Sequence, residues 1–198
     1  MERINRRVCV FIDNSNLFHA IKALKEQDRH LNYVKLRDHL ANGRIADVRF
    51  YYSMPARPKN TYLDAMRQYE KLSRFYLGIK SLGYQMVELP LRERTVFSTN
   101  GRATVPKEKG LDCEIVYDMA TLSRTGSYHS FVLVAGDEDY ARTVRRVRQD
   151  AGIKVDVAFF GDSRCSNVLI KEASEFLDLS QEVNSLFRET RSKHYVLA

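Results

Sequence analysis

The sequence predicts an α/β fold, in which helices cover both faces of a mainly parallel sheet of about five to six strands. Short apolar runs rich in β-branched residues recur along the chain, and longer segments of helical spacing separate them. This alternation is typical of a parallel sheet in a three-layer sandwich. With 198 residues and 44% hydrophobic content, the chain can bury one good core and is short for two, so we expect a single domain over residues 1–198.

Five apolar runs have the composition of interior strands, and the segments between them have apolar residues at helical spacing. The expected strands are Val8 to Ile12, Asp47 to Ser53, Tyr84 to Leu89, Ser130 to Ala135 and Lys154 to Phe160. The expected helices are Asn14 to Gln27, Val34 to Ala41, Thr61 to Ser81, Asp112 to Ser123 and Glu138 to Ala151, with two shorter ones after Asp162 and Gln181. Gly83, Gly126 and Gly152 are the expected helix terminators.

One segment breaks this alternation. From Arg92 to Gly110 the chain is polar and basic, with Asn100 and Gly101 between two short runs of strand-forming residues. Because Asn-Gly favours a tight primed turn, we expect a small basic β-hairpin inserted at residues 92–110. Its charged residues are Arg92, Arg94, Arg102, Lys107 and Lys109 against Glu93 and Glu108. A solvated loop and a flap that grips the substrate both stay open.

The net charge and the cysteine spacing favour some classes of protein and argue against others. A net charge of +7 and a pI near 9.3 favour a polyanionic partner, because Lys and Arg on phosphates release condensed counterions. Cys9, Cys113 and Cys165 are far apart and lack a CxxC spacing, which argues against a disulfide framework and a zinc knuckle. No run has the apolar length of a signal peptide or the ~20 residues of a membrane span. We expect a soluble, cytoplasmic protein without a membrane partner.

The first chemically informative motif is VCVFIDNSN, an apolar strand that leads directly into Asp13, Asn14, Ser15 and Asn16. Ligands bind at the carboxyl ends of the strands in a parallel α/β sheet, so Asp13 is expected at the edge of a site. Asp, Asn and Ser are also preferred helix N-caps, so this motif taken alone has a structural explanation.

Two further motifs add acids. FVLVAGDEDY ends another apolar strand in Asp137 and Asp139, which repel each other unless a positive charge such as a divalent cation lies beside them. In KGLDCEIVYDM, Asp112 opens a helix, where the helix dipole favours a carboxylate, and Asp118 follows six residues later. The ends of the first and fourth strands are expected to be neighbours, and the helix at Asp112 leads into the fourth strand. Several acids should therefore converge on one cleft.

Together, FIDNSN, KGLD with a further Asp six residues later, and AGDEDY resemble the NYN domain, which includes the LabA-like proteins and belongs with the PIN-like nucleases. The resemblance runs from Val8 to about Leu179, because SNVLIKEASEFLDL is similar to the closing helix and strand of that domain, and it puts the core at about residues 7–180. It implies a Rossmann-like, PIN-like sheet, an acid cluster that binds Mg²⁺ or Mn²⁺, and endonucleolytic hydrolysis of RNA. Asn14 and Ala135 depart from the Gly and Ser that members often have, and neither departure removes a carboxylate.

By position, the resemblance assigns Asp13, Asp112 and Asp137 as direct or water-mediated metal ligands, and Asp139 as a further ligand or the group that orients the attacking water. These acids are expected to be both metal-binding and catalytic. Asn16 would hold a carboxylate or contact phosphate, and Asp118 matches a second acid of the middle helix. Mg²⁺ prefers oxygen ligands and keeps several waters, one of which can attack phosphorus.

The helix Glu138 to Ala151 carries arginines immediately beyond these acids. They are Arg142, Arg145, Arg146 and Arg148, while its apolar face has Tyr140, Val144 and Val147. As a group, the arginines predict a substrate-binding track for RNA, with DNA as the alternative. Each one alone is also explained by a solvated helix face. A homodimer or a protein partner stays open.

Three other interpretations compete. DNSN resembles a metal-adhesion motif that coordinates through Ser15, as in a binding module of the von Willebrand type, but that module does not need Asp137 and Asp139. A phosphatase of the haloacid dehalogenase type needs a second acid at the position where this chain has Ser15. A catalytically weak or inactive RNA-binding or regulatory subunit with the same fold would keep all the acids, so the sequence does not separate it from a nuclease.

Overall fold

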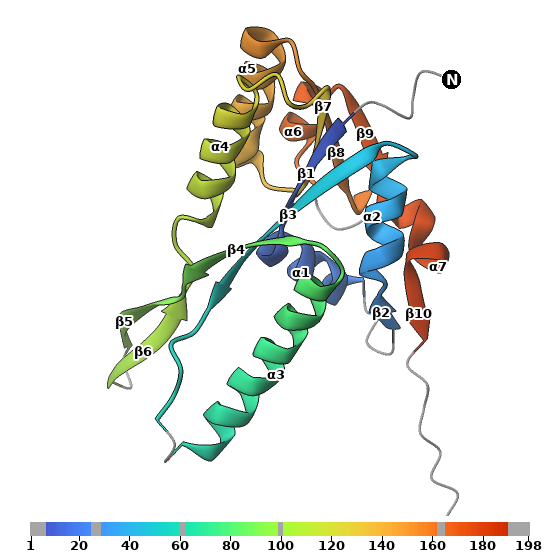
Figure 1. Ribbon diagram of the computed structural model, residues 1–198. Coiled ribbons are helices and arrows are strands. Elements are labelled where there is room, and N and C mark those ends of the chain that lie inside the picture. Colours follow the sequence, from blue (N-terminus) through green and yellow to red (C-terminus); the bar gives the residue numbers. More distant parts are fainter. Residues whose placement is uncertain (1–6, 25–28, 60–61, 99–100, 162–164, 190–198) are drawn as a thin grey trace, which may run out of the picture.

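A six-stranded sheet forms the centre of the structure, a computed structural model that describes residues 7–24, 29–59, 62–98, 101–161 and 165–189 (Figure 1). In spatial order its strands are β4 (Gln85–Pro90), β3 (Ile45–Met54), β1 (Arg7–Asp13), β7 (Ser130–Val134), β8 (Lys154–Phe159) and β9 (Glu175–Asp178). Every neighbouring pair is parallel. The predicted α/β fold with a mainly parallel sheet of about five to six strands is confirmed.

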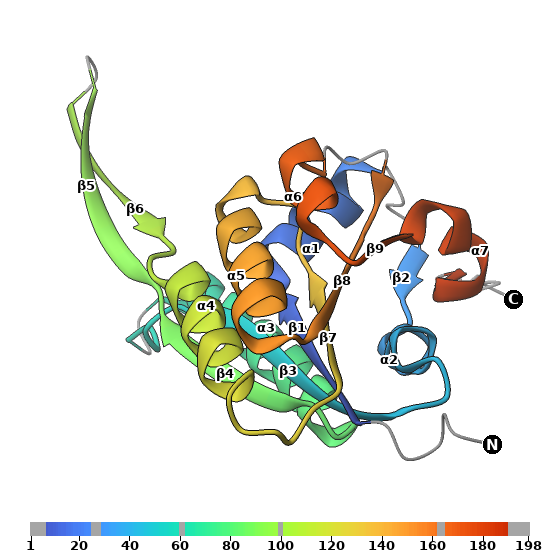
Figure 2. The same cartoon turned by 90° about the horizontal axis from the view of Figure 1, so that it is seen from above.

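Helices cover both faces of this sheet (Figure 2). On one face lie α1 (Asn14–Ala23), α2 (Tyr33–Ala41), α3 (Leu63–Ser81) and α7 (Val183–Leu186); on the other lie α4 (Leu111–Leu122), α5 (Ala141–Ala151) and α6 (Asn167–Glu172). Strand β1 serves both cores, because successive side chains of a strand point to opposite faces. Val8, Val10 and Ile12 pack on the first face, and Cys9 and Phe11 on the second.

Several predicted boundaries differ from the structure. The helix expected from Glu138 begins as a 3₁₀ turn, η1 (Glu138–Tyr140), and α5 begins only at Ala141. Helix α1 ends at Ala23, and residues 25–27, which were expected to continue it, lie outside the described residues, as do Thr61 and Asp162. Near the expected last helix the chain forms a 3₁₀ helix, η3 (Leu179–Glu182), before α7.

Two small antiparallel ladders lie outside the main sheet. Strands β2 (Arg29–Leu31) and β10 (Phe187–Glu189) form one that was not predicted, because three residues are too few to show an alternating pattern. The other is the hairpin of β5 (Arg92–Ser98) and β6 (Gly101–Lys107), which pairs from Arg92 with Lys107 to Ser98 with Gly101. It leaves the body directly after β4 and returns to it before α4 (Figure 2). Asn100, the expected turn residue, lies outside the described residues.

The strand order places a ligand site at the ends of β1 and β7. From β1 the chain builds outward through β3 and β4, and it then returns to the other side of β1 to add β7, β8 and β9. The direction of winding therefore reverses between β1 and β7, and in open α/β sheets the crevice at the carboxyl ends of such strands is where ligands bind. Asp13 ends β1, and Asp137 follows β7 by three residues.

Candidate active site

Asp13 lies at the buried centre of this crevice. It is the last residue of β1 and the N-cap of α1, and only 3% of it is exposed. Its Oδ1 accepts a hydrogen bond from the Asn16 backbone N–H at 3.0 Å, and its Oδ2 accepts one from the Asn16 amide Nδ2 at 2.9 Å. Burial raises the pKa of Asp13, and hydrogen bonds from the Asn16 backbone N–H and the Tyr140 hydroxyl, which favour the charged form, oppose the rise.

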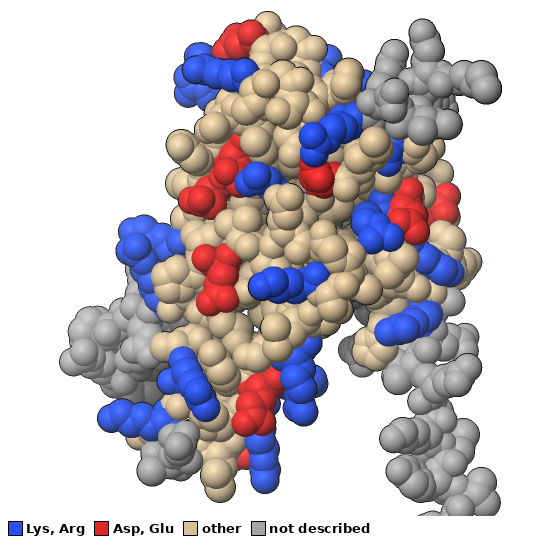
Figure 3. All heavy atoms as spheres, viewed as in Figure 1, with Lys and Arg blue, Asp and Glu red and all other residues tan. Residues whose placement is uncertain are grey.

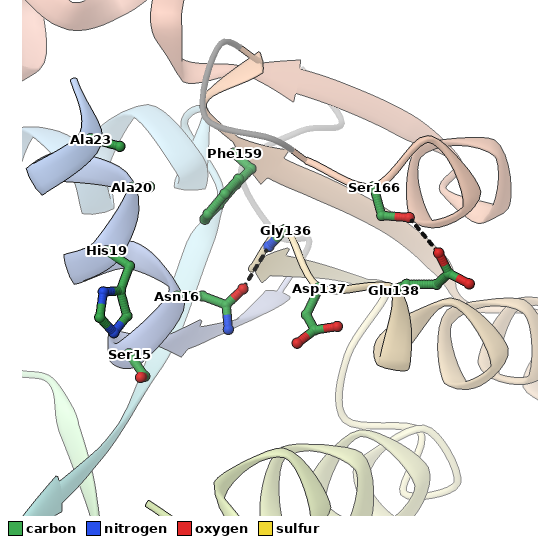
Figure 4. Close-up of a pocket in the computed structure, with 10 residues that line it drawn as sticks. All are labelled: Ser15, Asn16, His19, Ala20, Ala23, Gly136, Asp137, Glu138, Phe159 and Ser166. Atoms are coloured by element: carbon green, nitrogen blue, oxygen red, sulfur yellow. Dashed lines mark hydrogen bonds between the residues drawn. The ribbon is translucent and has the colours of Figure 1, made fainter. Parts of the chain in front are cut away.

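Asn16 connects Asp13 to the neighbouring strand. While its Nδ2 donates to Asp13, its Oδ1 accepts a hydrogen bond from the Gly136 N–H at 3.2 Å (Figure 4). Gly136 itself packs against Phe159, since a Cβ atom added at residue 136 would lie 2.4 Å from the Phe159 ring. The ends of β1, β7 and β8 are thus held together at the site by one amide and one close backbone contact.

Tyr140 is a site residue that the sequence analysis assigned only to the apolar face of its helix. Its hydroxyl donates to Asp13 Oδ2 at 2.7 Å, and the residue is 1% exposed. Burial, together with the nearby Asp13 carboxylate, raises the pKa of Tyr140, so the phenol stays protonated and remains a donor. In the sequence, the position of Tyr140 directly after Asp139 could have indicated a site residue. The direction of its hydroxyl, however, is set by the 3₁₀ turn η1.

The predicted acids share one hollow of about 370 Å³ at the carboxyl edge of the sheet. Asp13, Asp112, Asp137 and Asp139 all line it, and they come from three segments that are distant in sequence. Asn16 lines it as well. Glu108 and Lys109, which the sequence analysis treated only as hairpin charges, also line the hollow because β6 delivers the chain to its rim.

Local backbone structure explains how the exposed acids reach the hollow. Gly110 adopts φ +89°, a left-handed conformation that glycine tolerates and that turns the chain into α4, where Asp112 stands in the first turn. Asp137 Oδ1 accepts the Asp139 N–H at 3.1 Å and so caps η1. In Figure 4 the Asp137 carboxylate projects into the open space beside Asn16.

The four acids that line the hollow lack an ion-pair partner among the described residues, although Lys109 lines the same hollow. Within the described part of the chain, no Lys or Arg forms an ion pair with Asp13, Asp112, Asp137 or Asp139. By contrast, Asp118 forms an ion pair with Arg49 at 2.6 Å and accepts a 2.6 Å hydrogen bond from the Tyr51 hydroxyl. It does not line the hollow, so the structure gives the second acid of the middle helix a packing role.

The arginines of α5 do not line the hollow either. Arg145 lies 3.5 Å from Glu172, and Arg146 lies 3.9 Å from Asp150. Arg145 instead lines a separate depression beside Lys154, the first residue of β8, at the opposite edge of the sheet. Arg142, in the first turn of α5, is exposed, and of the helix's arginines it lies nearest to the acids along the chain. Substrate binding by Arg142, Arg145 and Arg146 stays a prediction.

The donor set fits a hard divalent cation that keeps much of its water. Carboxylate oxygens are the ligands that Mg²⁺ and Mn²⁺ favour. No three His, Cys, Asp or Glu side chains among the described residues lie close enough to form a ready-made metal site. Mg²⁺ commonly uses only one or two carboxylates and completes its shell with water and substrate phosphate, so the arrangement fits that class of site and not a closed protein cage.

A larger groove of about 760 Å³ adjoins the hollow and shares Ser15, Asn16 and Asp137 with it (Figure 4). Its far wall is formed by Phe159 and by Ser166, whose hydroxyl lies 3.4 Å from a Glu138 oxygen. The acids therefore lie at the side of an extended depression, a shape that can accommodate a chain-like ligand.

Comparisons with known proteins agree with this fold. A crystal structure of a protein of unknown function from Vibrio parahaemolyticus superposes with a TM-score of 0.65 at 17% sequence identity, covering 90% of this chain and 96% of that one. At this identity the likeness concerns the fold alone. A search of curated proteins found no match. The sequence profile of the NYN domain matches residues 7–180. Because this match covers most of the chain, the protein belongs to the NYN domain family.

Proposed function

We propose that the protein is a metal-dependent nuclease that hydrolyses phosphodiester bonds of RNA. One observation carries the proposal: Asp13, Asp112, Asp137 and Asp139 line a single hollow, and none of them forms an ion pair with a described Lys or Arg, although Lys109 lines the same hollow. Like charges gathered in this way are costly unless a cation joins them. The nuclease character of the NYN family supports the same conclusion. Membership of the LabA-like group and a cytoplasmic location stay predictions; among the described residues, no helix has the length and apolarity to cross a bilayer.

The chain's own residues have distinct roles in this proposal. Asp13, held by Asn16 and Tyr140, presents a fixed carboxylate from the floor, while the exposed Asp112, Asp137 and Asp139 supply oxygens from the rim. When bound, Mg²⁺ or Mn²⁺ supplies an activated water and stabilises the charge that develops on the phosphate. Asp139, whose side chain is exposed, is placed to orient water or accept its proton. Lys109, which also lines the hollow, can contact a phosphate oxygen.

The distribution of charged side chains on the surface indicates which residues contact the phosphates of the RNA. On the face shown in Figure 3, basic side chains are scattered among acidic ones and form no continuous basic surface. The segment 92–109 contains five basic residues, of which Lys109 lines the hollow; the others are Arg92, Arg94, Arg102 and Lys107. We propose that this hairpin, with Arg142, provides the electrostatic contact to RNA.

The test is cleavage of labelled single-stranded RNA by the purified protein with Mg²⁺, with Mn²⁺ and with a chelator. Metal-dependent internal cleavage that the Asp13→Asn variant loses supports the proposal. Asp118→Asn serves as the matched control, because it changes an acid outside the hollow. RNA binding without cleavage under either metal would favour a regulatory RNA-binding subunit, and cleavage that survives Asp13→Asn would point to a contaminant.

A further inference from the structure

A second pocket lies beside the acid hollow and has a different chemical character. It has a volume of about 410 Å³ and is lined by Cys113, Val116, Tyr117 and Ala120 of α4 together with Asp112, Asp139 and Tyr140. The last three also line the hollow, so the two spaces share a wall. The residues that line this pocket include no Lys or Arg.

Tyr117 is an exposed aromatic residue of this pocket and is not part of the core. It is 65% exposed, whereas Leu111, Ile115 and Met119 form the buried stripe of α4. Residues 113, 116, 117 and 120 share the other side of the helix because they are three to four positions apart. The fold therefore leaves an aromatic ring accessible to solvent five residues after Asp112 on the same helix.

We propose that Tyr117, with Val116 and Ala120, forms a stacking site for an unpaired nucleobase of the substrate. The inference rests on the proposed function, since the base would belong to a nucleotide that flanks the phosphate held at the acids. A pocket without Lys or Arg suits a base and not the phosphate backbone. Stacking on an aromatic ring tolerates any base, because every base has a π-face.

The site would make the enzyme selective for single-stranded RNA. In a duplex the bases are already paired and stacked, and sequence-reading proteins reach them mainly in loops, bulges and ends. A flexible or unpaired strand can place its phosphate at the acids and its neighbouring base on Tyr117. Fully paired RNA cannot do so without losing base pairs.

The chain contains no tryptophan, so a Tyr117→Trp variant carries a single fluorescent reporter. The variant is mixed with a short single-stranded oligoadenylate in Mg²⁺ and again in EDTA, and fluorescence is recorded before cleavage proceeds. We expect quenching by the single strand in Mg²⁺ and little quenching by a duplex of equal length. Tyr62→Trp is the matched control, because Tyr62 is 64% exposed at the start of α3, and it should not respond.

Affinity measurements complete the test. Tyr117→Ala should weaken binding of the oligoadenylate about tenfold, the order expected for one base–aromatic stack, while Tyr117→Phe and Tyr62→Ala should bind as the wild type does. Equal quenching by single-stranded and duplex RNA, no quenching at all, or wild-type affinity of Tyr117→Ala would overturn the stacking site. If the wild type cleaves no RNA but the quenching and the affinity loss persist, the stacking site stands and the hydrolytic function fails.

Discussion

Replacing Tyr140 by Phe removes one hydroxyl from the centre of the site and leaves the ring in place. That hydroxyl donates to Asp13 Oδ2 at 2.7 Å, with Tyr140 1% and Asp13 3% exposed. Solvent is nearly excluded, so water cannot easily replace the lost donor. The Asp13 carboxylate would keep its bonds from Asn16 and lose the one from Tyr140.

The expected loss of stability depends on whether the hydrogen-bond acceptor is charged or neutral. A hydrogen bond to a charged group contributes about 1.5–3 kcal/mol to stability, against about 0.5–1.5 kcal/mol for a neutral one. Tyr84 provides the neutral comparison, because it is 3% exposed and its hydroxyl donates to the Tyr33 carbonyl at 2.6 Å. Tyr140→Phe should therefore lower the free energy of unfolding by about 1.5–3 kcal/mol, measured by urea denaturation in metal-free buffer, and should exceed the effect of Tyr84→Phe.

A double-mutant cycle measures how much the charge of Asp13 contributes to its hydrogen bond with Tyr140. In an Asp13→Asn background the acceptor is neutral, so Tyr140→Phe should cost less there than in the wild type. If Tyr140→Phe costs no more than Tyr84→Phe, or costs the same in both backgrounds, Asp13 is not held as a charged acceptor by Tyr140.

Three other variants test the surrounding geometry. Gly136→Ala places a methyl group 2.4 Å from Phe159, so overpacking should lower the free energy of unfolding by about 1–3 kcal/mol, measured by thermal unfolding. Combining it with Phe159→Leu should restore part of this loss. An unchanged melting temperature of Gly136→Ala would contradict the close contact. Asp118→Asn should weaken the ion pair with Arg49 and lower the free energy of unfolding, but leave the metal dependence of RNA cleavage unchanged. A loss of metal dependence would mean that Asp118 belongs to the active site. Burial raises the pKa of Asp156 above its ordinary value of 3.8, so its charged form destabilises the fold and stability falls as the pH rises through that range. Asp156→Asn should therefore unfold at higher urea than the wild type at neutral pH, and the difference should shrink toward pH 4; a difference that grows at low pH would reverse the sign.

The strands and the acid cluster could be predicted because they depend on simple rules. Apolar runs such as Val8 to Ile12 predict interior strands, and ligands bind at the carboxyl ends of such strands, so the sequence predicts that Asp13 and Asp137 lie near each other. Asp112 could be predicted because the helix dipole favours a carboxylate at the start of a helix, and α4 begins at Leu111. All of them line the same hollow.

The roles of the other residues could not be predicted, because they depend on the direction in which each side chain points from its helix. Asp112 and Asp118 are six residues apart, and at about 100° per residue this puts them on different sides of α4; Asp118 reaches Arg49 and not the hollow. The arginines of α5 lie progressively further from the acids as the helix rises about 1.5 Å per residue, so Arg145 pairs with Glu172 instead. Tyr140 looked like a packing residue because nothing in a periodic pattern shows where a hydroxyl points.

We propose that acids from three distant segments bind divalent metal at the junction of β1 and β7. A crystal grown with Mn²⁺ and measured at the manganese absorption edge tests it most directly. We predict an anomalous peak inside the hollow, in contact with oxygens of Asp13, Asp112, Asp137 or Asp139 or with waters held by them. Manganese bound only elsewhere on the molecule, with this hollow containing water alone, would contradict the claim.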